Sequence, residues 1–164
     1  MLRGLIIGLI GFMLISCTSI VNTGKLTDLP DTTTVVVLPF ENHTETPMAG
    51  LRVASLLESI LRTKGYVIEE RFWKLKDVDY TPEEIKGLLK EARQKGVDYV
   101  FTGSVNEFRY KTGIDGEPAV SITVDLYNTA DGKVIWSSAG SATGWSHEST
   151  GTVTQKLLNK LVRK

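Results

Sequence analysis

The chain is poor in the residues that build disulfides, metal sites and charged fields. It has one cysteine, Cys17, and two histidines, so no internal disulfide can form and the Cys/His spacing of a structural zinc site is absent. Nineteen basic residues balance nineteen acidic ones, and no sequence-wide field attracts nucleic acid. Stability must therefore come from a hydrophobic core, and any charged surface must arise from folding or assembly.

Recognisable catalytic patterns are also missing. His43 and His147 lie far apart and have no helical partner of the kind that binds a metal, and no serine elbow or glycine-rich phosphate loop is present. The glutamates are too scattered to suggest the acid pair of a glycosidase. We therefore expect a protein that is not an enzyme and needs no metal or other cofactor, although a site assembled across subunits would be invisible in one sequence.

No hydrophobic run is long enough to cross a bilayer. The apolar stretch from Leu5 to Ile15 follows a lone Arg3 and is about half of the roughly 20 residues that a membrane-spanning helix needs. It ends in Leu14-Ile15-Ser16-Cys17, with a small residue directly before the cysteine. This pattern is typical of a bacterial lipoprotein signal and predicts that residues 1–16 are removed.

Cleavage before Cys17 would leave that residue as an acylated N-terminus. Several acyl chains on one residue anchor a protein stably, whereas a single chain holds only marginally. Thr18 is not the aspartate that retains many lipoproteins at the inner membrane, so convention favours the outer membrane, with the protein facing the periplasm. The alternative is an uncleaved hydrophobic N-terminus with an incidental cysteine.

The remaining 148 residues are enough for one domain. Residues 17–33 are polar, contain Pro30 and show no sustained periodicity, so we expect a lipidated cysteine followed by a flexible tether. The folded domain is expected at 34–164. Its first strand, 35–38, is a continuous aliphatic run typical of a strand buried on both faces in the middle of a sheet.

Periodicity and capping signals predict the other elements. Helical spacing covers 47–64 and 82–95, the second helix beginning with a capping box at Thr81. A short strand is expected at 66–69 and a loop with buried aromatic residues at 71–80. Long strands at 99–110, 119–127 and 133–138 should form an antiparallel meander, followed by a helix from about 146. The fold class is thus α/β, a single mixed sheet in the order β-α-β-α-β-β-β-α packed against helices.

Two stretches resemble known envelope proteins. The run Val35 to Asn42 (VVVLPFEN) with the helix after it resembles the opening of the TolB amino-terminal domain and of the curli secretion lipoprotein CsgG, which marks a fold and not a function. Tyr110 to Val120 (YKTGIDGEPAV), followed by IWSSAG at 135–140 and TGWS at 143–146, is similar to the PelC family of Pel exopolysaccharide export systems.

The second resemblance implies a role in polymer export. It implies a lipoprotein of the outer membrane that assembles into a homo-oligomeric ring in the periplasm. The ring would lie beneath a β-barrel exporter with TPR repeats, similar to PelB, and would guide a cationic exopolysaccharide outward during biofilm formation. The family is not catalytic, and its ring is understood to have an acidic face and aromatic residues near the membrane.

The two tryptophans of the C-terminal half call for different interpretations. Trp145 lies between Gly144 and Ser146 in an expected loop, where an indole could contact membrane lipid. A tryptophan folded back over the core is equally compatible with this position. Trp136 alternates within a strand and is interpreted as core packing.

Four charged residues are candidates for assembly or for an acidic face. Arg109 and Asp125 fall on strands that flank one turn, so they could pair within a subunit or across a ring interface, although two solvated charges are as compatible with the pattern. Asp115 and Glu117 lie at the turn and could add carboxylates to a ring, unless they only form the turn.

A regulator of an envelope enzyme is the alternative function. The activator LpoB of a penicillin-binding protein shares the fold type and docks one-to-one on an inner-membrane synthase. The tether argues against this role, because its roughly 16 residues reach at most about 55 Å when fully extended.

Overall fold

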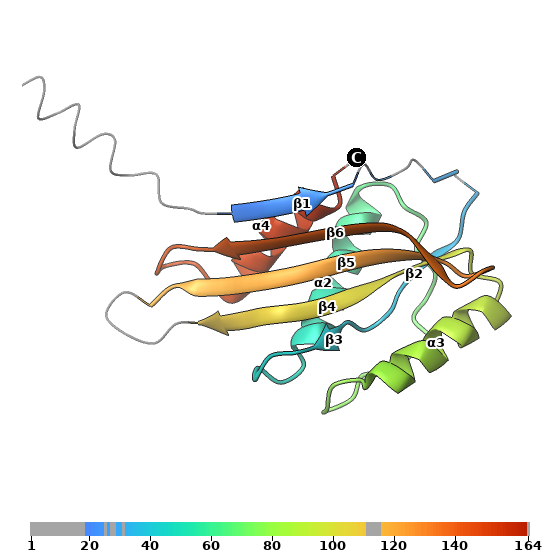
Figure 1. Ribbon diagram of the computed structural model, residues 1–164, viewed down its shortest axis with the longest axis horizontal. Helices are drawn as coiled ribbons and strands as arrows, with labels where there is room; N and C mark the ends of the chain where they lie inside the picture. Colours follow the sequence, from blue (N-terminus) through green and yellow to red (C-terminus); the bar gives the residue numbers. More distant parts are fainter. Residues whose placement is uncertain (1–18, 25, 27–28, 31, 111–115, 164) are drawn as a thin grey trace, which may run out of the picture.

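One six-stranded sheet organises the molecule. The computed structural model describes residues 19–24, 26, 29–30, 32–110 and 116–163. The sheet has the order β1-β6-β5-β4-β2, and β3 also pairs with β4. The elements are β1 (Ser19–Thr23), β2 (Val35–Val37), β3 (Glu41–Asn42), α2 (Ala49–Thr63), α3 (Pro82–Gln94), β4 (Tyr99–Tyr110), β5 (Pro118–Asn128), β6 (Lys133–Thr143) and α4 (Thr150–Leu161) (Figure 1).

The sheet is mixed, as expected from the sequence. Strands β4, β5 and β6 form the antiparallel meander, whereas β2 and β3 run parallel to β4. Helices α2 and α4 lie behind the sheet in Figure 1, and α3 lies at the lower right, below β4. This arrangement confirms the α/β fold class.

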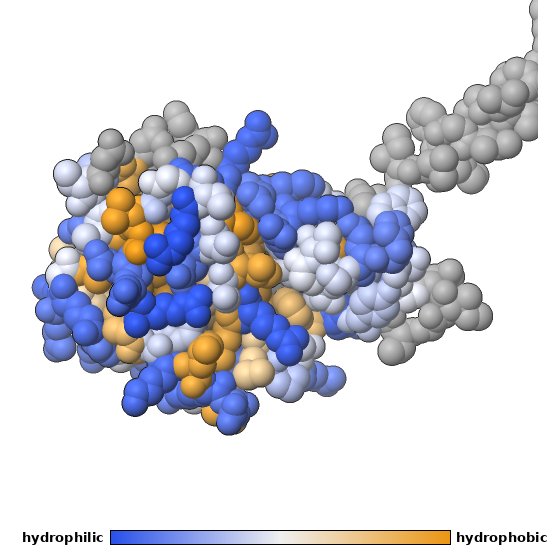
Figure 2. Space-filling model, turned by 180° about the vertical axis from the view of Figure 1, so that it is seen from behind, coloured by the Kyte–Doolittle hydropathy of each residue, from blue (hydrophilic) through white to orange (hydrophobic). Residues whose placement is uncertain are grey.

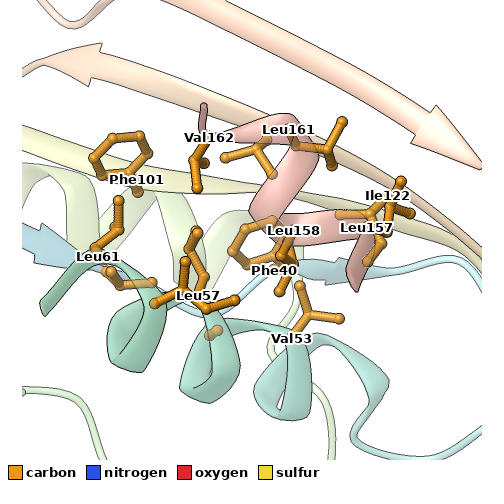
Figure 3. Packing of buried hydrophobic residues seen from close by; sticks show 14 of the residues in the cluster. Phe40, Val53, Leu57, Leu61, Phe101, Ile122, Leu157, Leu158, Leu161 and Val162 are labelled. Atoms are coloured by element: carbon orange, nitrogen blue, oxygen red, sulfur yellow. The ribbon is translucent and has the colours of Figure 1, made fainter. Parts of the chain in front are cut away.

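The main core fills the space between the sheet and the two helices behind it. Leu57 and Leu61 of α2 meet Leu157 and Leu158 of α4 over Phe101 of β4, and all five are almost completely buried (Figure 3). Their helical spacing explains this burial, because residues three and four apart share one face of a helix. The core therefore ties α2 and α4 to the same side of the sheet.

A second, smaller core lies on the other side, around α3. The capping box predicted at Thr81 is present, with the Thr81 side chain accepting from the Glu84 backbone N–H at 3.2 Å. Trp73 and Tyr80 are buried as expected for the loop at 71–80, and the Trp73 indole N–H donates to the Val37 carbonyl at 2.9 Å. This layer covers β2 and part of β4, and it reaches β5 at Tyr127.

Two expectations about strands near this layer are wrong. The strand expected at 66–69 is reduced to a single bridge between Val35 and Ile68, with the Glu69 N–H donating to the Val35 carbonyl. Strand β2 is indeed buried on both faces, but it ends the strand order instead of lying in the middle of the sheet. The bridge at Ile68 covers its outer edge, which explains why β2 can be fully apolar there.

The expected tether contains a strand of the sheet. Strand β1 pairs antiparallel with β6, from Ser19 opposite Ala142 to Thr23 opposite Ser138. Leu26, in the same stretch, is 2 % exposed. The folded domain therefore begins well before residue 34. Polar residues hide β1 in the sequence, because an edge strand buries only one of its side chains in part.

The C-terminal boundaries also differ from expectation. Strand β6 continues to Thr143, five residues beyond the predicted end, because small residues at its far end allow β1 and α4 to approach. A Cβ at Gly140 would lie 2.9 Å from the Ile20 carbonyl oxygen and 3.0 Å from Leu157. Helix α4 begins at Thr150 after the N-cap Ser149, and not near 146. No helix in the part of the chain described here is long and apolar enough to span a membrane.

Candidate functional site

Four strand ends meet at one end of the sheet. Ser19 at the start of β1 pairs with Ala142 near the end of β6, and the Gly144 N–H donates to the Pro118 carbonyl at the start of β5 with 2.9 Å between the atoms. The Tyr110 hydroxyl, at the end of β4, donates to the Ser146 carbonyl. We call this region, formed by Ser19, Tyr110, Pro118, Gly144 and Trp145, the Trp145 end.

Trp145 belongs to a tight turn and lies at the surface of the protein. Its side chain is 37 % exposed and belongs to neither core, whereas Trp136 is 7 % exposed and packs edge-on against Phe101. The interpretation of Trp136 as core packing is therefore confirmed. Gly144 is buried against Val153, so the chain enters the turn with no room for a side chain there.

Glu148 holds the turn at Trp145 in place. It accepts a hydrogen bond from the Trp145 backbone N–H at 3.0 Å and contacts the Lys156 ammonium on the first turns of α4. The hydrogen bond from Lys156, followed by that from the Trp145 N–H, keeps the pKa of Glu148 below its ordinary value. The turn is thus fixed by a carboxylate that stays ionised, and the tryptophan side chain is left free of these contacts.

The second feature is a sheet surface that no helix covers. On the side of α3, most outward residues of β5 and β6 are not covered by a helix, because α3 and the 71–80 loop cover β2 and β4 and reach β5 only near Tyr127 (Figure 1). We call this surface the open sheet face. It consists mainly of short polar side chains from neighbouring strands: Ser121, Thr123, Asp125, Ser137, Ala139 and Ser141.

Arg109 and Asp125 share this face but do not pair with each other. The register sets Arg109 opposite Ala119 and Asp125 opposite Thr102, at different heights on the sheet. The Arg109 guanidinium donates to Glu107 at 2.6 Å, and Asp125 accepts from the Ser137 hydroxyl at 2.6 Å. A pair within one subunit is therefore excluded, and the idea that each charge contacts another subunit stays a prediction.

Acidic groups gather around Asp125. Burial raises the pKa of the Tyr127 phenol, and the nearby carboxylates of Asp125 and Glu41 raise it further. Glu41 contacts His43 at 3.3 Å, and a shallow groove beside α3 joins these residues. The edge of the open sheet face next to α3 therefore brings together two carboxylates, Asp125 and Glu41, with Lys86 of α3 at the same groove.

The remaining predicted site residues are not brought together. Cys17, the signal peptide and Asp115 lie outside the described residues. Glu117 is half-buried and directly precedes β5. The sequence interpretation missed Tyr110, Glu148 and β1, and only the spacing of Trp145 and Glu148, three residues apart before a helix, could have indicated a cap. Within the described ranges no group of three or more acidic, histidine or cysteine residues could hold a metal ion.

Comparison with known proteins identifies relatives among solved structures. No protein-family model matches the sequence, and no curated protein sequence matches it. A PelC dodecamer from Paraburkholderia phytofirmans is 33 % identical, with a TM-score of 0.72 over 88 % of this chain and 96 % of that one. A single-residue variant of that protein, also a dodecamer, is 32 % identical, with a TM-score of 0.73 over 87 % of this chain and 96 % of that one.

A more distant structure shares the fold alone. The lipoprotein GNA1162 from Neisseria meningitidis is 17 % identical, with a TM-score of 0.54 over 78 % of this chain and 96 % of that one. The similarity to the two PelC structures is much stronger, because their sequences are more than 30 % identical to this chain across nearly their whole length. On that basis the chain belongs to the PelC family.

Proposed function

We propose that the protein is a non-enzymatic lipoprotein of the outer membrane that forms a periplasmic ring for exopolysaccharide export. In this role it guides a cationic polymer toward a β-barrel exporter similar to PelB. The observation that carries the proposal is the identity of 32–33 % with PelC structures, each of them a dodecamer. The polymer and the exporter follow from the family resemblance.

The position of β1 supports an orientation on the membrane. Only Thr18 separates Cys17 from β1, so an acyl group on Cys17 would start within about 7 Å of Ser19. Ser19 belongs to the Trp145 end, and an exposed indole is well suited to the interface between head groups and acyl chains. We therefore propose that the Trp145 end faces the bilayer and that the strands point away from it.

The same feature argues against the regulator hypothesis. A lipoprotein that docks on an inner-membrane synthase from the outer membrane needs a long reach. The pairing of β1 with β6 leaves no such length, because the sheet begins two residues after the lipidated cysteine. The domain should stay at its own membrane.

Measuring the mass of the assembled protein tests the ring. We expect the full chain, produced in a bacterial envelope and extracted in mild detergent, to form a discrete oligomer of about twelve subunits, as the related structures do. Light scattering coupled to gel filtration gives the protein mass in the micelle. If the protein is strictly monomeric, both with and without detergent or liposomes, the proposed ring is wrong.

Replacing Trp145 with alanine tests the membrane contact. We expect Trp145→Ala to weaken binding of the unlipidated domain, residues 18–164, to liposomes about ten-fold, because burial of an indole in the interface is lost. Tyr99→Phe, which removes a hydroxyl away from the Trp145 end, serves as the control. Unchanged liposome affinity together with unchanged thermal stability would mean that Trp145 does not contact lipid.

A further inference from the structure

We propose that the open sheet face of one copy packs against the outer surface of α2 and α4 of the next copy. This contact would join subunits head to tail. The inference rests on the ring proposed above and names the two surfaces that build it. We call the second surface, formed by the exposed residues of α2 and α4, the outer helical face.

The open sheet face carries apolar side chains that nothing covers. Ile20 on β1 pairs with Ser141 and is 65 % exposed, and Val134 on β6 pairs with Tyr127 and is 47 % exposed. Both lie on the same side of the sheet as Asp125, near opposite ends of β6. Large aliphatic residues that flank a polar sheet surface are a common feature of protein interfaces.

Short side chains between these two residues leave the sheet surface flat. The hydroxyls of Ser121 and Ser141 bond to each other at 2.9 Å, and Ala139 lies opposite Thr123 on the next strand. Solvent-exposed strands are usually rich in longer β-branched and aromatic side chains. A surface of serine and alanine instead lets the helices of a second molecule approach closely.

Charge distinguishes the two surfaces. Glu107 and Asp125 lie on the open sheet face, and Glu41 and Glu45 line grooves that continue it. The basic residues beside these four carboxylates are Arg109 and Lys86. The outer helical face has the opposite sign. Helices α2 and α4 contain the basic residues Arg52, Arg62, Lys156 and Lys160 and the acidic residue Glu58.

Apart from its charged residues, the outer helical face is mainly hydrophilic, and apolar residues are exposed among the polar ones. Figure 2 shows it from behind the view of Figure 1, with hydrophobic residues exposed among polar ones. Arg52 and Lys160 are exposed on α2 and α4. An acidic sheet face and a basic helical face are complementary, and complementary potentials favour one partner surface over others.

The two surfaces lie on opposite sides of one sheet. A contact between them is heterologous, because each subunit offers a different surface to each neighbour. Such contacts form a closed ring when the rotation between neighbours closes, and the PelC relatives are dodecamers. A contact between two open sheet faces would instead repel, since both are acidic, and would stop at a dimer.

Charge reversal on each surface tests the inference. Variant S carries Glu107→Lys and Asp125→Lys on the open sheet face, and variant H carries Arg52→Glu and Lys160→Glu on the outer helical face. We expect each variant alone to be monomeric at concentrations where the wild type is a large oligomer. A control with Glu83→Lys and Glu91→Lys on α3 makes the same charge change as S away from both surfaces, and it should assemble normally.

Mixing the two variants distinguishes a head-to-tail contact from any other. In variant S the helical face is intact, and in variant H the sheet face is intact, so one S and one H should join through these two surfaces. The two outer surfaces of that pair, the basic sheet face of S and the acidic helical face of H, are also opposite in charge, so mixing should restore a large oligomer with equal numbers of S and H. Native mass spectrometry separates the two chains by mass.

The outcomes separate this inference from the ring itself. If the wild type does not assemble, the proposed ring fails and the interface fails with it. If the wild type assembles and variants S and H assemble equally well, the ring stands and the interface is wrong. Monomeric variants that do not pair on mixing also overturn the head-to-tail contact, provided that their circular dichroism matches the wild type.

Discussion

Substitution of Gly50 by alanine is expected to lower the stability of the domain strongly. Gly50 lies in the first turn of α2, where the helix touches the chain between β2 and β3. An added Cβ would overlap the carbonyl oxygen of Phe40 and lie 3.0 Å from its carbonyl carbon. Because the obstacle is backbone, either α2 or the strand region must move, and both belong to the main core.

The size of this effect follows from overpacking. Extra atoms in a packed interior cost about 1 to 3 kcal/mol, and a collision with backbone falls at the upper end of that range. For a domain of this size a loss of about 3 kcal/mol lowers the melting temperature by roughly 6 to 12 °C. Thermal unfolding followed by circular dichroism measures the shift.

Gly87 provides the matched control for Gly50. It lies inside α3, is exposed, and an added Cβ there meets nothing within 4 Å. Gly87→Ala should therefore stabilise the protein by about 0.5 to 1 kcal/mol through helix propensity. Equal melting temperatures for Gly50→Ala and the wild type would show that α2 does not approach Phe40 this closely.

Serine in place of Cys17 is expected to remove the protein from the outer membrane. Serine has no thiol to accept a diacylglycerol, and without that group neither cleavage by the lipoprotein route nor further acylation follows. The uncleaved chain keeps the apolar run from Leu5 to Ile15 but carries no acyl chain, so it should not reach the outer-membrane fraction. Fractionation of the envelope with an antibody against the full chain measures this change.

Ser16→Ala is the control for this experiment. It keeps a small residue before Cys17 and should leave the fractionation unchanged. The melting temperature of Cys17→Ser after purification should equal that of the wild-type domain, since Cys17 precedes the first strand. Continued recovery of Cys17→Ser with the outer membrane would mean that protein contacts, and not lipid, hold the chain there.

Elements with strong local signals could be predicted from the sequence. We could predict the meander, α2 and the capping box at Thr81 because periodicity and capping depend only on residues that are close together in the chain. The core position of Trp136 followed from alternation in the same way. The family resemblance, too, was carried by continuous stretches such as 110–120.

Features that depend on distant partners could not be predicted. Strand β1 has no apolar alternation and is defined by β6, and β3 is only two residues long. Met48 adopts a left-handed backbone at the start of α2, where its N–H donates to Asp79, 31 residues further along the chain. The separation of Arg109 from Asp125 depends on the register and bulge between β4 and β5, which turn residues alone do not reveal.

The pairing of β1 with β6 also bears on the order of folding. Each residue of β1 meets a partner more than 110 positions later, whereas only short segments of sequence separate β4 from β5 and β5 from β6. Closing so large a loop costs entropy that local hairpins do not incur, so contacts between near neighbours in the chain form first. The residues of β1 are synthesised before those of every other strand, yet they must wait for nearly the whole chain before their strand can join the sheet.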